Sequence, residues 1–172
     1  WWKISQVIDD FNLIRKQNIA TSNLRDIDET MSAFCPQTTR YGNIPHLSFG
    51  AREPEPLGTE FKNSADGTSK IMLGLHLCRN KNDDKGDKTY DNHTTMKTAR
   101  VTLKLQEDTN KDELDGFGNF INDNPTPPIF LGDSWFTSVN QCVLTKKIHG
   151  ANYIGVLKTN HSRYPKKFLA RT

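Results

Sequence analysis

Apolar positions recur along the chain with two different periods, and the two periods predict two kinds of element. In residues 4–17 they recur every three or four positions, which predicts an amphipathic helix that packs through one face. In residues 24–34 the period shortens to two, which predicts a strand. One side of that strand carries three polar side chains, Asp26, Asp28 and Thr30. Its two acids therefore share a face.

A hairpin is predicted after a long connection. Residues 36–58 hold four prolines and three glycines, and proline cannot sit inside a central strand, so this stretch is expected to be irregular. Residues 59–65 and 71–78 are then predicted to form two strands joined by a turn at Asp66 and Gly67.

Residues 96–106 fit both periods, so periodicity alone leaves strand and helix open for this stretch. The polar residues on either side, 79–95 and 108–128, are predicted to be loops because they are rich in Asn, Asp, Gly and Pro.

The last elements alternate between strand and helix. A short apolar strand is predicted at residues 129–131, and Thr137 or Ser138 can cap a helix that Gly150 would end. A further strand is predicted over residues 153–157. This order of elements predicts an α/β fold with a mixed sheet.

Length and composition indicate one polar, folded domain. The chain has 172 residues, of which 34% are hydrophobic and 25% charged. Its longest apolar stretch, residues 71–77, is far shorter than the ~20 residues that a membrane-spanning helix needs, so no membrane partner is expected. The chain begins with Trp1 and Trp2 and shows no signal peptide, which suggests a piece of a longer protein. Its three cysteines are widely separated, which favours a reducing compartment over a disulfide or structural zinc framework.

Charge is distributed unevenly along the chain. Residues 1–60 hold six basic and eight acidic residues, whereas residues 146–172 hold seven basic residues and no acid. The basic side chains of this last segment are Lys146, Lys147, Lys158, Arg163, Lys166, Lys167 and Arg171. Aromatic residues lie among them, and this mixture can neutralise phosphates and stack on bases. The segment is therefore a candidate DNA-binding surface, with a solvated tail as the alternative.

Two carboxylates stand out by their position on predicted strands. Asp28 lies in the middle of the first strand, and Asp133 follows the strand at residues 129–131. Strand ends are where open α/β sheets build their sites, and carboxylate oxygens are preferred ligands of Mg²⁺. If the two strands are neighbours, both side chains can meet one divalent cation of the kind used in phosphoryl transfer. The alternative is that each aspartate only caps a turn.

Four strings of the sequence resemble, in the same order, motifs of the catalytic core of piggyBac-type transposases and of host proteins derived from them. They are DIDETM at 26–31, PEPLGTEFK at 54–62, GDSWFTSV at 132–139 and VLKT at 156–159. The corresponding family motifs include DE-x-M, KP-x-x-x-G and D-N/S-x-F-T/S-S. The resemblance covers residues 4–169, which is most of the chain.

The resemblance implies an RNase H-like domain with flanking helices, present in part, with residues 1–20 as a leading helix and residues 21–172 as the core. It implies a helix at 96–106. It also implies that Asp28 and Asp133 are catalytic and hold Mg²⁺ or Mn²⁺ for cleavage and transfer of DNA strands. DNA is the implied partner and the nucleus the implied location, and a homodimer is left open.

Three departures from the family pattern leave enzymatic activity undecided. No Asp or Glu follows Asp133, although the family has a third catalytic acid downstream. The Cys-rich C-terminal module of the family has no counterpart in this sequence, and Glu55 replaces the lysine of the KP pair. The chain is expected to be an incomplete catalytic core, either part of a transposase or a decayed copy. The alternatives are a transposase-derived domain that binds DNA without cutting it, and a soluble α/β domain without either function.

Overall fold

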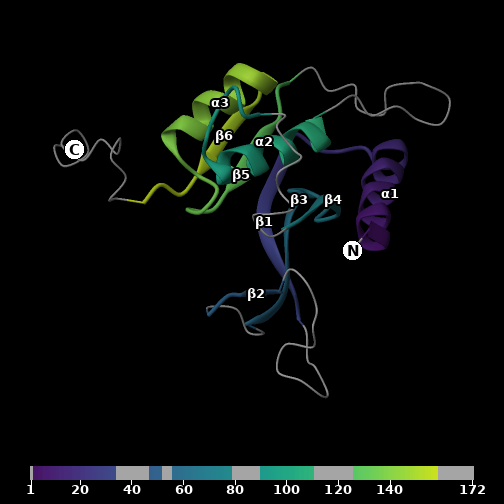
Figure 1. Ribbon diagram of the computed structural model, residues 1–172. Coiled ribbons are helices and arrows are strands. Elements are labelled where there is room, and N and C mark those ends of the chain that lie inside the picture. The colour runs from purple at the N-terminus through teal and green to yellow at the C-terminus, as the bar shows by residue number, and fades with distance from the viewer. Residues whose placement is uncertain (1, 34–46, 52–55, 79–89, 111–125, 159–172) are drawn as a thin grey trace, which may run out of the picture.

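A computed structural model describes residues 2–33, 47–51, 56–78, 90–110 and 126–158, and Figure 1 shows their arrangement. The elements, in chain order, are α1 (Trp2–Asn18), β1 (Leu24–Ala33), β2 (Leu47–Phe49), β3 (Leu57–Asp66), β4 (Met72–Leu77), α2 (Lys97–Asn110), β5 (Ile129–Gly132), α3 (Val139–His149) and β6 (Asn152–Gly155). They confirm the α/β order predicted from the sequence. None of the described helices combines the length and apolar character that crossing a membrane requires.

The described strands form one mixed sheet with β1 at its centre. On one side β1 pairs antiparallel with β3, whose other edge pairs with β2 and, further along, with β4. On the other side β1 pairs parallel with β5, and β5 pairs parallel with β6. Parallel neighbours need a crossover connection, and α3 supplies it between β5 and β6.

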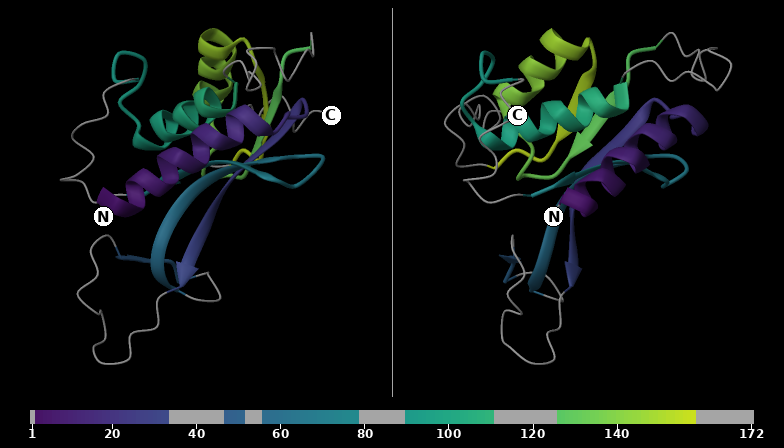
Figure 2. Two further views of the ribbon diagram at one scale, coloured as in Figure 1. Left: turned by 90° about the vertical axis from the view of Figure 1, so that its right-hand side faces the viewer. Right: turned by 45° about the vertical axis from the view of Figure 1, so that its right-hand side comes forward.

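Helices α2 and α3 pack together and cover the same face of the sheet, whereas α1 lies along β4 (Figure 2). The main core cluster lies beneath α2 and α3 and consists of Ile27, Leu105, Phe130, Phe136 and Ala151, each at most 2% exposed. Asp26, Asp28 and Thr30 alternate with Ile27 along β1 and therefore point to the opposite face.

The predicted first helix is confirmed as α1, but only part of its apolar stripe packs, since Ile8 is buried and other members of the stripe are exposed. Val7 and Ile14 are 66% and 57% exposed, whereas Arg15 is 2% exposed and donates to the Asp108 carbonyl. The side chain of Asn12 both donates to the carbonyl of Leu75 and accepts from its N–H. Because β4 presents unpaired backbone groups at this edge, a polar side chain satisfies them better than an apolar one.

The ambiguous stretch at 96–106 is helical from Lys97 onward, in α2, as the family resemblance implies. Its buried positions include polar side chains, since Thr102 and Gln106 are both fully buried. Gln106 accepts from the Thr145 hydroxyl of α3, and that hydroxyl accepts from Gln141. This buried polar contact joins the two helices and explains why an apolar period alone did not reveal the helix.

Two other sequence-based boundaries need correction. Residues 36–58 were expected to be irregular throughout, but strand β2 forms at 47–49 and β3 begins at 57. The pairing of β2 with β3 provides the hydrogen bonds that the short segment lacks by itself. Residues 108–110, expected in a loop, extend α2. The two predicted loops were 79–95 and 108–128. Residues 79–89 and 111–125, which make up most of them, lie outside the described residues.

The predicted hairpin is confirmed, and Asp66 anchors its turn. The Asp66 carboxylate is buried and accepts hydrogen bonds from the backbone N–H groups of Ser22, Thr68 and Ser69 and from the Ser69 hydroxyl. Burial alone would raise the pKa of this carboxyl, but the hydrogen bonds from Ser69 and Ser22 outweigh it and lower the pKa to about 2. The ionised form therefore ties the hairpin to the start of β1.

We predict that Asp66→Asn lowers the free energy of unfolding at neutral pH by about 2 kcal/mol, the value of a pKa lowered from 3.8 to about 2. Because the folded-state pKa is depressed, this stabilisation is complete above the ordinary aspartate pKa and is lost as the pH falls through about 2. Urea unfolding across this pH range measures it, with the exposed Asp9→Asn as control. A deficit that did not shrink in acid would contradict this role of Asp66.

Candidate functional site

The parallel pairing of β1 with β5 brings the two predicted site residues to neighbouring strands. Ile27 pairs with Gly132, so the next positions in register are Asp28 and Asp133. Asp133 lies just beyond the carboxyl end of β5, at the edge where α/β sheets commonly bind ligands. Both aspartates are exposed to solvent.

Asp133 organises the turn between β5 and α3. Its Oδ1 atom accepts the backbone N–H groups of Trp135 at 2.7 Å and Phe136 at 3.3 Å, and its carbonyl accepts the N–H of Thr137. This is the turn-capping role that the sequence left open. It occupies one carboxylate oxygen, and within the described residues Oδ2 has no hydrogen-bond partner.

In Asp28, as in Asp133, only one of the two carboxylate oxygens accepts a hydrogen bond from the described residues. Its Oδ1 atom accepts the N–H of Glu29 at 2.8 Å, and its Oδ2 atom has no partner among the described residues. Each aspartate thus has one oxygen oriented by the backbone and a second that faces solvent. That combination suits a metal ligand as well as a turn residue.

Glu29 and Lys62 form an ion pair on the face of β1 and β3 opposite to the face of Asp28, and sequence analysis did not single out either residue. They are direct partners in the pairing of β1 with β3, and Lys62 Nζ lies 3.4 Å from Glu29 Oε2. Lys62 is only 3% exposed and also contacts the Glu60 carboxylate. A lysine within a strand is ordinarily solvated, so the burial of Lys62 carried no signal in the sequence.

Burial raises the pKa of Glu29, and Lys62 partly opposes this shift. The charges of Asp133 and Asp28 raise the pKa further, since like charges nearby disfavour ionisation. Both aspartates therefore act electrostatically on the same glutamate. Lys62 is the buried positive charge that opposes these effects.

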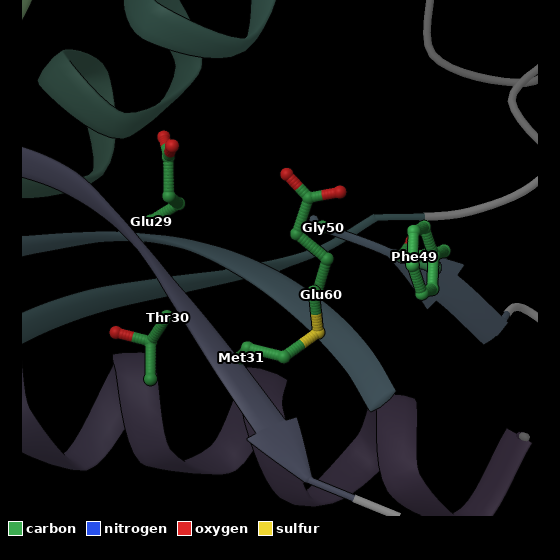
Figure 3. Close-up of a pocket in the computed structure, with 7 residues that line it drawn as sticks. Glu29, Thr30, Met31, Phe49, Gly50 and Glu60 are labelled. Atoms are coloured by element: carbon green, nitrogen blue, oxygen red, sulfur yellow. The ribbon is translucent and has the colours of Figure 1, made fainter. Parts of the chain in front are cut away.

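A cavity of about 160 Å³ lies next to this ion pair, lined by Glu29, Thr30, Met31, Ser48, Phe49, Gly50 and Glu60. Figure 3 shows the Glu29 and Glu60 carboxylates pointing to the same side, whereas Thr30 points to the other side of β1. The cavity thus adjoins the Glu29–Lys62–Glu60 cluster, on the face of the sheet opposite Asp28.

Trp135 and Phe136 lie in the turn that directly follows Asp133. Phe136 is 2% exposed and belongs to the core, and Trp135 is 41% exposed and packs edge-on against it, with ring centroids 4.6 Å apart. Lys62 Nζ lies 3.8 Å from the centroid of the Trp135 ring, which is a cation–π contact.

Two paired glycines keep the base of the site compact. A Cβ at Gly132 would lie 2.1 Å from the Tyr153 hydroxyl, and one at Gly155 would lie 2.7 Å from the Gly132 carbonyl. Both distances are far below van der Waals contact, so β5 and β6 pack this tightly only with glycine at these positions. Burial raises the pKa of Tyr153 to about 12, and its hydroxyl donates to the Phe136 carbonyl at 3.3 Å.

The described members of the predicted DNA-binding set, Lys146, Lys147 and Lys158, lie at two opposite ends of the sheet. Lys146 and Lys147 lie near the carboxyl end of α3, where Lys146 bonds to Gly150 and to Asn152 at the start of β6. Because α3 runs back from the end of β5, Lys146 and Lys147 lie at the opposite end of the strands from Asp133. Lys158 follows the end of β6 and lies exposed on the same edge as Asp133. The remaining predicted residues, Arg163, Lys166 and Lys167, lie outside the described residues.

The residues present suit a hard divalent cation. In the described part of the chain no three His, Cys, Asp or Glu side chains are grouped to hold a metal ion. Mg²⁺, however, is commonly held by one or two carboxylates, with water and substrate phosphates completing its shell. The solvent-facing oxygens of Asp28 and Asp133 are donors of the required kind.

The topology defines the class of domain as RNase H-like α/β, with β1, β3 and β4 antiparallel and β5 and β6 parallel to β1. The fold is similar to that of the piggyBac transposase in a cryo-EM structure of its synaptic complex with hairpin DNA. The TM-score is 0.66 at 16% sequence identity, over 96% of this chain and 29% of that one. This likeness confirms, at the level of the fold, the resemblance seen in the sequence motifs. No protein-family model and no curated protein matches the sequence.

We predict that Glu29→Gln becomes more stable relative to the wild type as the pH rises above the ordinary glutamate pKa. Since the folded-state pKa of Glu29 is raised, its contribution to stability is complete below the unfolded pKa and is lost as the pH rises through the folded one. Glutamine does not titrate. Chemical denaturation of both proteins at a series of pH values measures the difference, and a constant difference would show that folding does not raise the pKa of Glu29.

Proposed function

We propose that this chain is the metal-binding core of a piggyBac-like transposase, acting on the phosphodiester backbone of DNA. The observation that carries the proposal is the pairing of β1 with β5, which puts Asp28 and Asp133 in neighbouring register positions. The fold it shares with a transposase supports the same function. Because the chain spans 29% of the length of that transposase, strand cleavage and transfer by the whole protein are part of the proposal.

In this proposal Asp28 and Asp133 hold Mg²⁺ or Mn²⁺ through their solvent-facing oxygens. The bound cation would supply Lewis acidity for phosphoryl transfer. The backbone N–H groups of Trp135 and Phe136 orient the Asp133 carboxylate, and the N–H of Glu29 orients that of Asp28. The exposed Lys158 lies on the same edge and would contact a DNA phosphate.

We predict that the chain binds Mn²⁺ through both aspartates. Asp28→Asn and Asp133→Asn should each weaken Mn²⁺ binding by at least about tenfold, the loss that even outer-shell changes cause at metal sites. Asp26→Asn is the matched control, because Asp26 lies two positions before Asp28 on the same face of β1 and pairs with Lys70. Paramagnetic broadening of backbone amide signals during a Mn²⁺ titration reports both affinity and place. Equal affinities for the Asp26 and Asp28 variants would refute the shared site.

A second function, DNA binding without cleavage, is favoured by one observation. Asp28 and Asp133 each have one carboxylate oxygen engaged by backbone N–H groups, as residues that only cap turns also do. A transposase-derived domain that only holds DNA would need no cation at Asp28 and Asp133.

We predict that affinity for duplex DNA falls steeply with salt, because each phosphate neutralised by a lysine or arginine releases counterions. Each lost contact should reduce the slope of log K against log salt by about 0.9. Lys158→Ala should show this reduction, and the exposed Lys147→Ala on the opposite edge should show less. Fluorescence anisotropy at several salt concentrations measures both slopes.

The Asp133→Asn variant separates the two proposed functions. If the chain is the metal-binding core of a transposase, this variant loses Mn²⁺ binding in the presence of DNA. If the chain only holds DNA, Mn²⁺ plays no part and the variant binds DNA like the wild type. An affinity independent of salt would exclude both.

A further inference from the structure

Lys62 is the most unusual charged residue near the site. Its side chain lies on the face of β3 covered by the turn after β5, and it is 3% exposed. Transferring an ammonium group out of water is costly unless it is paired with opposite charge and hydrogen-bonded. A lysine this deeply buried therefore needs compensating contacts, and these contacts indicate what it does.

Two carboxylates from two strands compensate the charge of Lys62. Glu29 on β1 lies 3.4 Å from its Nζ, and Glu60, on the same face of β3, is also in ion-pair contact. The ammonium is thus fixed from one side by the central strands of the sheet. The contact with Glu29 is possible because Glu29 and Lys62 are direct partners in the strand pairing.

The other side of the ammonium faces the aromatic wall. Its Nζ lies 3.8 Å from the centroid of the Trp135 ring and 5.3 Å from that of Phe136. These are the two residues whose backbone N–H groups donate to Asp133 Oδ1. A continuous set of contacts therefore runs from the carboxylates on β1 and β3, through Lys62, to the turn that orients Asp133.

We propose that Lys62 is a positioning residue that clamps the Trp135–Phe136 turn onto the sheet and thereby fixes the orientation of the Asp133 carboxylate. The consequence for cation binding rests on the proposed function, whereas the positioning of the turn does not. Lys62 acts through Trp135 and Phe136 and does not itself hold the cation.

Positioning and simple electrostatics predict opposite results. If Lys62 acted only through its charge, its removal would make the acidic site more negative and would tighten cation binding. If it positions Asp133, its removal loosens the turn and weakens cation binding. A purely structural lysine would change the melting temperature and leave the turn and the cation affinity as they are.

The experiment compares four variants with the wild-type chain. Lys62→Met keeps the aliphatic stem without the charge, and Lys62→Arg keeps a cation that can stack on the indole ring. Trp135→Leu removes the ring from the other end of the contact, at a position exposed enough to tolerate it. Lys70→Met is the matched control, because Lys70 also pairs with a β1 carboxylate, Asp26, but is 72% exposed.

Three quantities are measured for each variant: the hydrogen-exchange rates of the Trp135 and Phe136 amides, the Mn²⁺ affinity, and the melting temperature. Lys62→Met and Trp135→Leu should speed exchange of the two amides by roughly tenfold, as expected for loss of a desolvated cation–π contact. Both should weaken Mn²⁺ binding by about tenfold, as outer-shell changes do. Lys62→Arg should restore both quantities, and Lys70→Met should change neither.

Unchanged amide exchange in Lys62→Met would overturn the proposal. Tighter Mn²⁺ binding in this variant would also overturn it. If Lys62→Met does not fold, the same two readouts in Trp135→Leu decide in its place. If the wild-type chain binds no Mn²⁺, the proposed function fails, while amide exchange still confirms or refutes the positioning role of Lys62.

Discussion

The parallel pairing of β1 with β5 is the constraint on which the rest of the site depends. It joins two strands that are about a hundred residues apart in sequence, and its register sets Asp28 beside the position of Asp133. The pairing is stabilised by Ile27 of β1 and Phe130 of β5, which belong to the same core cluster as Leu105 of α2. The tight approach of β6 through Gly132 and Gly155 then fixes where β5 ends. The exposed acids are thus placed by buried apolar contacts.

A second set of contacts, made of charges, packs against the turn that follows Asp133. Glu29 and Glu60 hold Lys62 against the aromatic residues that follow Asp133. Packing the site onto rigid strands and supporting it with a further shell of contacts is what precise metal and catalytic sites require. The same arrangement explains why a lysine is retained where burial alone would disfavour it. It also links the sheet to the start of α3, whose cap at Ser138 follows directly in the chain.

Much of the fold could be predicted from sequence because its signals are local. Alternation revealed β1, and Ser138 and Gly150 marked both ends of α3. The strand β2 could not be predicted because it exists only through its pairing with β3. Helix α2 was ambiguous because Thr102 and Gln106 occupy buried positions. The two aspartates were singled out from motifs and strand ends, whereas Lys62 was missed because its burial depends on contacts with β1 and with the turn after β5.

The central claim is that Asp28 and Asp133 converge on one divalent cation. A crystal structure of the chain soaked with Mn²⁺, with anomalous diffraction recorded to locate the metal, tests it most directly. The account predicts an anomalous peak at about 2.0 to 2.2 Å, the range for small divalent cations and carboxylate oxygens, from one oxygen of each aspartate. Carboxylates that turn to opposite faces of the sheet, with no peak between them, would contradict it.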